Sequence, residues 1–210
     1  MCGFIASLGL DLNQNDFKNA LNHLSRRGPD SEGIWSENKI FLGSRRLAIF
    51  DLNDRSNQPM QSLCSRYILV FNGSIYNYKS LRKHLIDNDV KLKTYSDTEV
   101  ILELFALEGP QMVSKLKGMF AFVIWDCKKK EAFAARDPYG IKPLFIGTNS
   151  EGIILASQVK TLLLTKQIST ERDINSQFSF WNLGYIIEPR TWFKNIKALK
   201  SGYYVRIKDG

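Results

Sequence analysis

Residues 119–137 read MFAFVIWDCKKKEAFAARD, and the expected fold class follows from them. Two apolar runs rich in aromatic and small residues flank the polar turn CKKK, a pattern that predicts a β-hairpin of two antiparallel strands. The first run is apolar on both faces instead of alternating between apolar and polar residues. A hairpin sheet that is dry on both sides must be covered on both sides by other layers.

Short segments of a similar kind lie on either side of this hairpin and predict more strands, at residues 39–50, 66–72, 143–147 and 152–157. The periodicity of apolar residues predicts two helices, over 15–27 and 77–88, and start and stop signals predict a third over about 98–108. Gly-Pro pairs follow the first and third helices as stop signals, and Ser96 or Asp97 is the expected N-cap of the third. The economical architecture is an α+β fold, a four-layer α/β/β/α sandwich with two antiparallel sheets inside.

With 210 residues, of which 44% are hydrophobic and 12% aromatic, the chain is long enough for one domain with a full core. It has 29 Lys and Arg against 21 Asp and Glu, so its net charge is 29 − 21 = +8. Such a charge raises nucleic-acid binding as a function, but the basic residues are scattered and no aromatic-basic motif accompanies them. We therefore expect no nucleic-acid partner, and a basic surface that faces an acidic partner domain.

The cysteines and histidines argue against a metal site and for a reducing compartment. Cys2, Cys64, Cys127, His23 and His84 are too far apart for any zinc-ligand spacing. Three cysteines without a disulfide framework are typical of the cytoplasm. The start of the chain has no signal-peptide pattern, and no apolar segment is long enough to span a bilayer, so we expect no membrane partner.

The chain begins MCGFIASLGL, with a cysteine directly behind the first methionine. One interpretation is a buried strand in which Cys2 acts as a small hydrophobe, since Phe4, Ile5 and Leu8 are apolar. The other is that Met1 is removed, so that Cys2 carries both a thiol and a free α-amine. This segment alone leaves both interpretations open.

Several common catalytic signatures are missing from the sequence. It contains no dinucleotide-binding G-x-G-x-x-G, no P-loop and no G-x-S-x-G nucleophile elbow. A pyrophosphate loop of the Ser-Gly-Gly-x-Asp-Ser kind is also missing. We therefore expect no cofactor in this domain.

A set of motifs, taken together in this order and spacing, resembles one known family. The motifs are MCGF (1–4), RRGPDSEG (26–33), SRRLAIFD (44–51), FNGSIYN (71–77), SDTEV (96–100), GMFAFVIWD (118–126), ARDPYGIKPLF (135–145) and EPRTWFKNIKALKSGYY (188–204). They resemble class II glutamine amidotransferases, specifically the N-terminal glutaminase domain of glutamine-hydrolysing asparagine synthetases. The resemblance implies the N-terminal nucleophile hydrolase fold for a single domain over 1–210, with about 190–210 leading toward a synthetase domain.

The resemblance makes Cys2 the nucleophile that attacks the side-chain amide of glutamine. A thiol is only slightly ionised at neutral pH and needs a base, and an α-amine with a pKa of about 7.7–8.0 suits that task. Asn72 and Gly73 are implied as oxyanion-hole donors, through a side-chain amide and a backbone N–H. The alternative for Asn72-Gly73 is a plain hairpin turn.

Arg46 and Asp97 are implied as the residues that hold glutamine. A guanidinium matches an α-carboxylate and a carboxylate matches an α-ammonium. Their alternatives are a surface arginine on a strand edge and a simple helix N-cap. Backbone contacts are expected from residues Leu47, Ala48, Ile49 and Phe50, and Ser74 lies in the substrate site where these synthetases usually carry glutamate.

The turn Arg27-Gly28-Pro29-Asp30 is typical of the family, and we expect it to fix the chain beside the site without a catalytic role. The resemblance implies hydrolysis of L-glutamine to L-glutamate and ammonia through a Cys2 thioester. The ammonia would amidate aspartate in a synthetase domain or subunit, which would require ATP and Mg²⁺. Whether copies of the chain associate stays open.

Two further hypotheses stand beside this one. The same glutaminase could serve another acceptor, such as a sugar carboxylate in polysaccharide biosynthesis. A non-catalytic domain could instead use the fold to bind glutamine or to scaffold a partner, and Ser74 is the feature that supports this interpretation.

Overall fold

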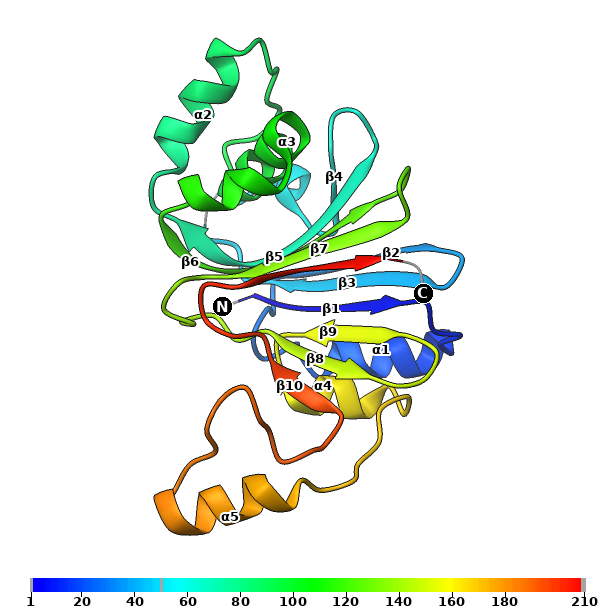
Figure 1. The fold of residues 1–210 in the computed structure, drawn as a ribbon. Coiled ribbons are helices and arrows are strands. Elements are labelled where there is room, and N and C mark those ends of the chain that lie inside the picture. Colours follow the sequence, from blue (N-terminus) through cyan, green and yellow to red (C-terminus); the bar gives the residue numbers. More distant parts are fainter. Residues whose placement is uncertain (1, 50, 209–210) are drawn as a thin grey trace.

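The computed structural model describes residues 2–49 and 51–208, so that Met1, Phe50, Asp209 and Gly210 lie outside the described residues. Figure 1 shows four layers: helices, two sheets packed face to face, and helices again. The predicted α/β/β/α sandwich is confirmed. The helices that cover the sheets are α1 (Gln14–Asn22) and α4 (Val159–Leu164) on one side, and α2 (Tyr78–Asp87) and α3 (Asp97–Glu108) on the other.

Every strand pair within the two sheets is antiparallel. The six-stranded sheet has the order β10-β8-β9-β1-β3-β2 and the five-stranded sheet the order β11-β7-β6-β5-β4. The first contains β1 (Gly3–Leu8), β2 (Ser31–Glu37), β3 (Ile40–Arg46), β8 (Phe145–Thr148), β9 (Ile153–Ala156) and β10 (Ile196–Ala198). The second contains β4 (Met60–Gln61), β5 (Tyr67–Ile75), β6 (Gly118–Asp126), β7 (Glu131–Arg136) and β11 (Tyr204–Lys208).

Strand β6 shows why its sequence is apolar on both faces. Phe122 and Ile124 belong to the core between the five-stranded sheet and α2 and α3. Val123 and Trp125, which alternate with them, belong to the core between the two sheets. Both faces are covered, and the predicted hairpin with β7 is confirmed, with Asp126 opposite Glu131.

A third core lies between the six-stranded sheet and the helices beneath it. Phe17 and Leu21 of α1 and Leu162 of α4 pack with Ile5 of β1, and all four are fully buried. The buried-strand interpretation of the chain start is therefore correct for the residues that follow Cys2.

Two predicted elements are shorter than expected. The helix over 15–27 ends at Asn22, because the N–H groups of Leu24 and Ser25 bond three residues back and tighten the chain into turns. The strand over 39–50 ends at Arg46, because the Ala48 N–H donates to the Asp30 carboxylate at 2.8 Å instead of to a neighbouring strand. Both changes bring turn 27–30 beside the start of β1.

The third predicted helix is correct, with Ser96 as its N-cap and Gly109 at φ 69° as its C-cap. The sequence reasoning did not predict β2, β4, α4, α5 (Ile174–Leu183) or the short 3₁₀ helices Asp54–Ser56 and Gly109–Lys115. The stretch 190–210 contains β10 and β11, each at an edge of one sheet, so it contributes to the sandwich itself. That it leads toward a further domain stays a prediction. Within the described part of the chain, every helix is too short or too polar to cross a membrane.

Candidate active site

The candidate site lies at the end of the sandwich where β1 begins and β3 ends. Because Gly3 pairs with Arg45, Cys2 comes beside the residues that follow β3. The N–H of Leu47 points at the sulfur of Cys2, with an N–Sγ distance of 3.4 Å. The thiol thus lies at the N-terminal end of β1, an interior strand of the six-stranded sheet, and shares a pocket with residues of β5 from the other sheet.

A pocket of about 190 Å³ brings together most of the predicted site residues. Ala48 does not line it, and Phe50 lies outside the described residues. The lining residues are Cys2, Arg46, Leu47, Ile49, Gln58, Phe71, Asn72, Gly73, Ser74, Asp97, Thr98, Met119 and Lys142. Segments that are far apart in the sequence therefore meet at one cavity.

The free edge of β5 supplies backbone N–H groups to this pocket. Strand β4 pairs only with Ile68 and Leu69, so the rest of that edge is open to other partners. The Phe71 N–H donates to Gln58 Oε1 at 2.7 Å and the Ile75 N–H donates to Asp97 Oδ2 at 3.0 Å. Gly73 lies between these two, and alternate residues of a strand direct their N–H groups to the same side.

The strand on the other side of β5 does not take the Gly73 N–H. Gly73 is opposite Phe120. Phe120, however, donates its N–H to Asp137 Oδ2 at 3.2 Å and accepts from the Asp137 N–H at 2.8 Å. The Gly73 N–H consequently points toward the pocket. A side chain does not fit at this position, because a Cβ would lie 2.3 Å from the Met119 carbonyl oxygen.

Asn72 adds a second donor from the neighbouring position. Its side chain is 1% exposed and points into the space between the sheets, as those of Ile68 and Val70 do. Among the described residues, its Nδ2 has no hydrogen-bond partner. A buried donor without a partner is costly, so this position favours a ligand oxygen. The hairpin-turn alternative is wrong, because Asn72 and Gly73 lie within β5.

Asp97 is the first residue of α3 and is almost fully buried, with 4% of its surface exposed. Burial raises the pKa of Asp97 to about 6, although N–H donors such as that of Ile75 and the charge of Arg46 oppose the rise. The N-cap alternative is wrong because Ser96 fills that role. A buried carboxylate on the pocket wall attracts a cation.

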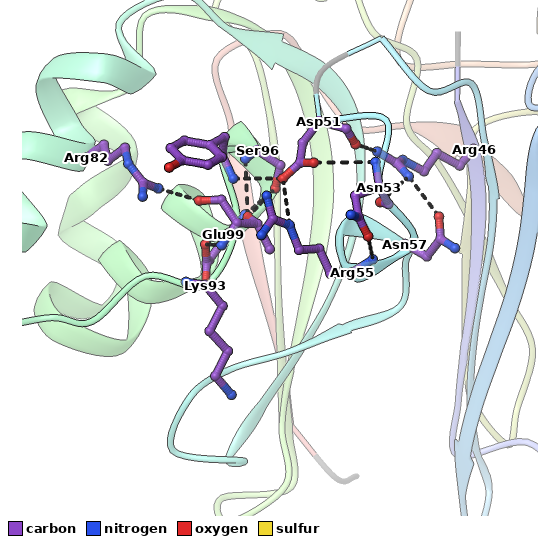
Figure 2. Close-up of polar contacts among 11 residues, drawn as sticks. Arg46, Asp51, Asn53, Arg55, Asn57, Arg82, Lys93, Ser96 and Glu99 are labelled. Carbon is purple, nitrogen blue, oxygen red and sulfur yellow. Dashed lines mark hydrogen bonds and ion pairs between the residues drawn. The ribbon is translucent and has the colours of Figure 1, made fainter.

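Arg46 is buried, so the surface-arginine alternative is wrong. Its guanidinium holds the segment that follows β3, as Figure 2 shows: Nη1 donates to Asn57 Oδ1 at 2.8 Å and Nη2 donates to the Asp51 carbonyl. Asp51 in turn accepts from the Tyr95 N–H at 2.8 Å, next to the start of α3. Arg46 therefore fixes segment 51–57, and Asp51 of this segment bonds to Tyr95, two residues before Asp97. Its predicted role of holding a substrate carboxylate stays a prediction.

Turn 27–30 holds the chain beside the site, as expected. Arg27 Nε donates to the Cys2 carbonyl oxygen at 3.1 Å, and the Asp30 carboxylate binds the Ala48 N–H. Gly28 packs so closely that a Cβ would lie 2.2 Å from the Arg45 carbonyl oxygen. The turn thereby fixes both Cys2 and the end of β3.

Lys142 is the main site residue that the sequence reasoning missed. It is 4% exposed and lines the pocket. Burial and the charge of Arg27 lower the pKa of Lys142, while Cys2 and Asp137 raise it, so these charges lie close together. The Asp137 carboxylate accepts from the Lys142 N–H at 2.9 Å and so fixes the loop. The signal that could have identified it is the position of this lysine inside the apolar run GIKPLF.

Gln58, Phe71, Thr98 and Met119 also line the pocket and were not predicted. Phe71, Thr98 and Met119 belong to motifs quoted above, whereas Gln58 lies outside all of them. The motifs do not show which of their members face the pocket, because strand pairing and helix packing decide that. Within residues 2–49 and 51–208, no group of three or more His, Cys, Asp or Glu side chains could hold a metal ion.

Comparisons with known proteins agree with this geometry. A model of the glutamine amidotransferase domain family matches residues 1–210. A protein of Mycobacterium bovis is 39% identical over 201 residues, which cover 89% of this chain and 31% of that protein. Glutamine-hydrolysing asparagine synthetase 1 of Bacillus subtilis is 34% identical over 217 residues, which cover 100% of this chain and 34% of that protein. The chain thus spans about a third of the length of these relatives.

A solved structure shows the same fold. Glutamine phosphoribosylpyrophosphate amidotransferase from B. subtilis, in complex with ADP and GMP, matches with a TM-score of 0.69 and 24% identity, over 79% of this chain and 44% of that chain. At this identity the likeness concerns the fold alone, the N-terminal nucleophile hydrolase fold. By the family model and its relatives, the chain belongs to the glutamine amidotransferase domain family, as a class II domain.

Proposed function

We propose that this domain hydrolyses L-glutamine to L-glutamate and ammonia with Cys2 as the nucleophile. The observation that carries the proposal is the convergence of three kinds of group on one pocket: a thiol at Cys2, two donors in the Asn72 amide and the Gly73 N–H, and a buried carboxylate at Asp97. Among the described residues, Asn72 Nδ2 has no hydrogen-bond partner. Amide hydrolysis through a covalent intermediate needs the first two, and recognition of a free amino acid needs the third.

In the first half-reaction, Met1 has been removed and the α-amine of Cys2 takes the proton of its own thiol. The sulfur forms a bond to the side-chain carbonyl carbon of glutamine, and the carbonyl oxygen becomes an oxyanion bound by Asn72 Nδ2 and the Gly73 N–H. The α-ammonium then returns the proton to the amide nitrogen and the C–N bond breaks. Ammonia departs, and a γ-glutamyl thioester remains on Cys2.

In the second half-reaction, water attacks the thioester carbon while the α-amine takes a proton from the water. The same two donors bind the new oxyanion. The C–S bond then breaks, the sulfur recovers the proton, and glutamate departs. One residue thus supplies the nucleophile and the base in both halves.

Substrate binding is assigned to the walls of the same pocket. Asp97 would hold the α-ammonium of glutamine, and Arg46 would share its donors between the α-carboxylate and the segment it already holds. Leu47 and Ile49 would contact the substrate from the segment after β3. Ser74, also on the wall, stands where asparagine synthetases usually carry a glutamate, and it leaves more room with one charge fewer.

The acceptor of the ammonia is a second part of the proposal. Because the chain spans about a third of relatives that include a glutamine-hydrolysing asparagine synthetase, aspartate is the favoured acceptor. ATP and Mg²⁺ would belong to the part that activates it. The free cysteines support a cytoplasmic location. Supplying the complete protein with ammonia, ATP and either aspartate or a sugar carboxylate would separate the two acceptor hypotheses.

The test of hydrolysis is glutamate release by protein whose mass proves that Met1 is absent. We expect release that stops after alkylation of Cys2, and covalent labelling of Cys2 by a diazo-ketone analogue of glutamine. Protein that retains Met1 should be inactive, because its Cys2 nitrogen is an amide and cannot act as a base. Processed protein that neither releases glutamate nor becomes labelled would favour the non-catalytic, glutamine-binding hypothesis.

A further inference from the structure

Helix α5 has its apolar and polar faces reversed relative to the core. Ser176 and Ser179 are buried, with exposed fractions of 0% and 8%. Ile174, Phe178 and Trp181 are 74%, 70% and 80% exposed. These three recur at i, i+4 and i+7, so they form one stripe along the outer side of the helix.

The stripe is presented by a well-anchored helix. Asp173 caps α5 by accepting from the Asn175 N–H at 3.0 Å and from the Ser176 hydroxyl at 2.8 Å. Its own N–H donates to the Trp192 carbonyl at 3.0 Å. The Phe180 ring packs on the Trp192 ring with centroids 5.1 Å apart. The exposed side chains are therefore held in place by contacts on the inner side.

The apolar surface continues beyond the helix. Leu183, Tyr185 and Ile187 are 51%, 60% and 43% exposed. Single exposed apolar residues are ordinary, but a contiguous set with several aromatics marks an interaction site. Aromatic residues are enriched at the centres of protein–protein interfaces. We refer to residues Ile174, Phe178, Trp181, Leu183, Tyr185 and Ile187 as the α5 face.

The α5 face is connected to the loop that bears Lys142. Glu188, which follows this face, forms an ion pair with the buried Arg136, with an Nη1–Oε2 distance of 3.0 Å. Arg136 also donates to the Lys142 carbonyl oxygen at 2.9 Å and to the Gly140 carbonyl oxygen at 2.8 Å. A partner bound at the α5 face would thus be linked, through Glu188 and Arg136, to the loop that bears Lys142 on the wall of the glutamine pocket.

We propose that the α5 face docks the part of the complete protein, fused or separate, that consumes the ammonia. This inference rests on the proposed function. Two thirds of the length of the curated relatives lies outside the region matched by this chain, which is ample to cover the face. Basic and acidic residues both flank α5, and two of the acidic ones are in ion pairs, Glu171 with Lys194 and Glu188 with Arg136. The docking partner should therefore match the α5 face through an apolar, aromatic-rich surface and not through net charge.

A labelling experiment on the complete protein tests the contact without depending on activity. Trp181→Cys and Ile86→Cys are built separately, and Ile86 serves as a matched control because it is 53% exposed on α2, in the layer on the far side of the sandwich. We expect a maleimide carrying a photo-crosslinker to label position 86 readily and position 181 slowly. Crosslinks from position 181 should fall on the ammonia-consuming part.

Free labelling at position 181, or crosslinks to a second copy of this same domain, would overturn the proposal. Glutamate release is measured on each sample before the maleimide is added, because the maleimide also alkylates Cys2. Its loss in unmodified protein would contradict the proposed hydrolysis, whereas free labelling with normal glutamate release would contradict only the docking.

A second measurement uses Phe178→Glu combined with Trp181→Glu in the complete protein. We expect glutamate release within about twofold of normal and ammonia-driven amidation unchanged, because neither residue lines the glutamine pocket. Glutamine-driven amidation should fall at least tenfold, because ammonia escapes from a loosened assembly. The control Ile86→Glu should leave all three rates unchanged, and unimpaired glutamine-driven amidation in the double variant would contradict the docking.

Discussion

Helices α3 and α5 are both rich in apolar residues but have opposite environments. In α3, every residue from Asp97 to Phe105 is buried between the five-stranded sheet and its neighbours. In α5, Ser176 and Ser179 are the buried residues and the large side chains face outward. The difference shows that apolar content alone does not identify a core helix, because the surrounding layers determine which faces are covered.

Two buried glutamates of α3 bind the backbone of neighbouring segments. In α3, Glu99 accepts from the N–H groups of Lys93 and Thr94, both at 2.7 Å, and Glu103 accepts from the Leu63 N–H at 2.7 Å. These bonds fix the start of the helix, and with it Asp97, against the pocket. Changes at the pocket should therefore affect hydrolysis, while changes at the α5 face should spare it.

The largest expected effect is that of Cys2→Ala. Glutamate release should fall to the uncatalysed background, because the thioester cannot form. Cys2→Ser should leave a weak activity, since a hydroxyl is a poorer nucleophile at neutral pH. Cys64→Ala is the matched control, because this exposed cysteine lies outside the pocket. Near-normal turnover of Cys2→Ala in a glutamate-release assay would contradict the assigned nucleophile.

Asn72→Ala should come next. Removing one oxyanion donor typically lowers kcat about 10²–10³-fold. The KM for glutamine should change less, because the donor acts mainly in the transition state. Steady-state kinetics with Asn88→Ala, on the surface after α2, as the control would check this. An equal loss in KM with unchanged kcat would instead place Asn72 in ground-state binding.

Asp97→Asn should weaken glutamine binding and stabilise the fold. Burial raises the pKa of Asp97 from its ordinary value of 3.8 to about 6, so folding favours the protonated form between these two pH values. Asp97 therefore destabilises the wild-type fold most above pH 6, where its buried carboxylate is ionised. The substitution should add up to about 3 kcal/mol to the free energy of unfolding at pH 7, and little at pH 4.

Urea unfolding at both pH values checks the stability effect. For wild-type protein, KM should rise as the pH falls through about 6, because protonated Asp97 no longer attracts an ammonium group. In Asp97→Asn the KM should be high and independent of pH over this range. A KM that stays at the wild-type value in the variant would contradict the assignment of Asp97 to substrate binding.

Trp181→Ser should have the smallest effect. The side chain is 80% exposed, so the free energy of unfolding should change by no more than about 0.5 kcal/mol, and glutamate release should stay within twofold. Leu102→Ala in α3 provides the contrast, because a fully buried leucine costs about 2–5 kcal/mol when truncated. Similar costs at positions 181 and 102 would show that α5 belongs to the core of this domain.

Much of the fold could be predicted because its signal is local. The two-faced apolar pattern of β6 requires covering layers, the helix over 77–88 has apolar periodicity, and the helix over 98–108 has start and stop signals. Strand β4 has only two residues and so gives no periodic signal. Helix α5 was missed although its sequence has an apolar stripe, the N-cap Asp173 and Gly184 behind its end. The site residues Gln58 and Met119 were missed because only packing brings them to the pocket.

The sequence by itself determined the layer order, the glutamine amidotransferase family and the identities of Cys2, Asn72, Gly73 and Asp97, because these follow from patterns of adjacent residues. Only the tertiary structure decided which of their atoms are available. Within the described part of the chain, the Gly73 N–H points toward the pocket because β4 stops short and Phe120 bonds to Asp137. The pKa of Asp97 is raised because packing of the start of α3 buries its carboxyl group. Availability and burial depend on residues distant in the chain, and no local pattern contains them.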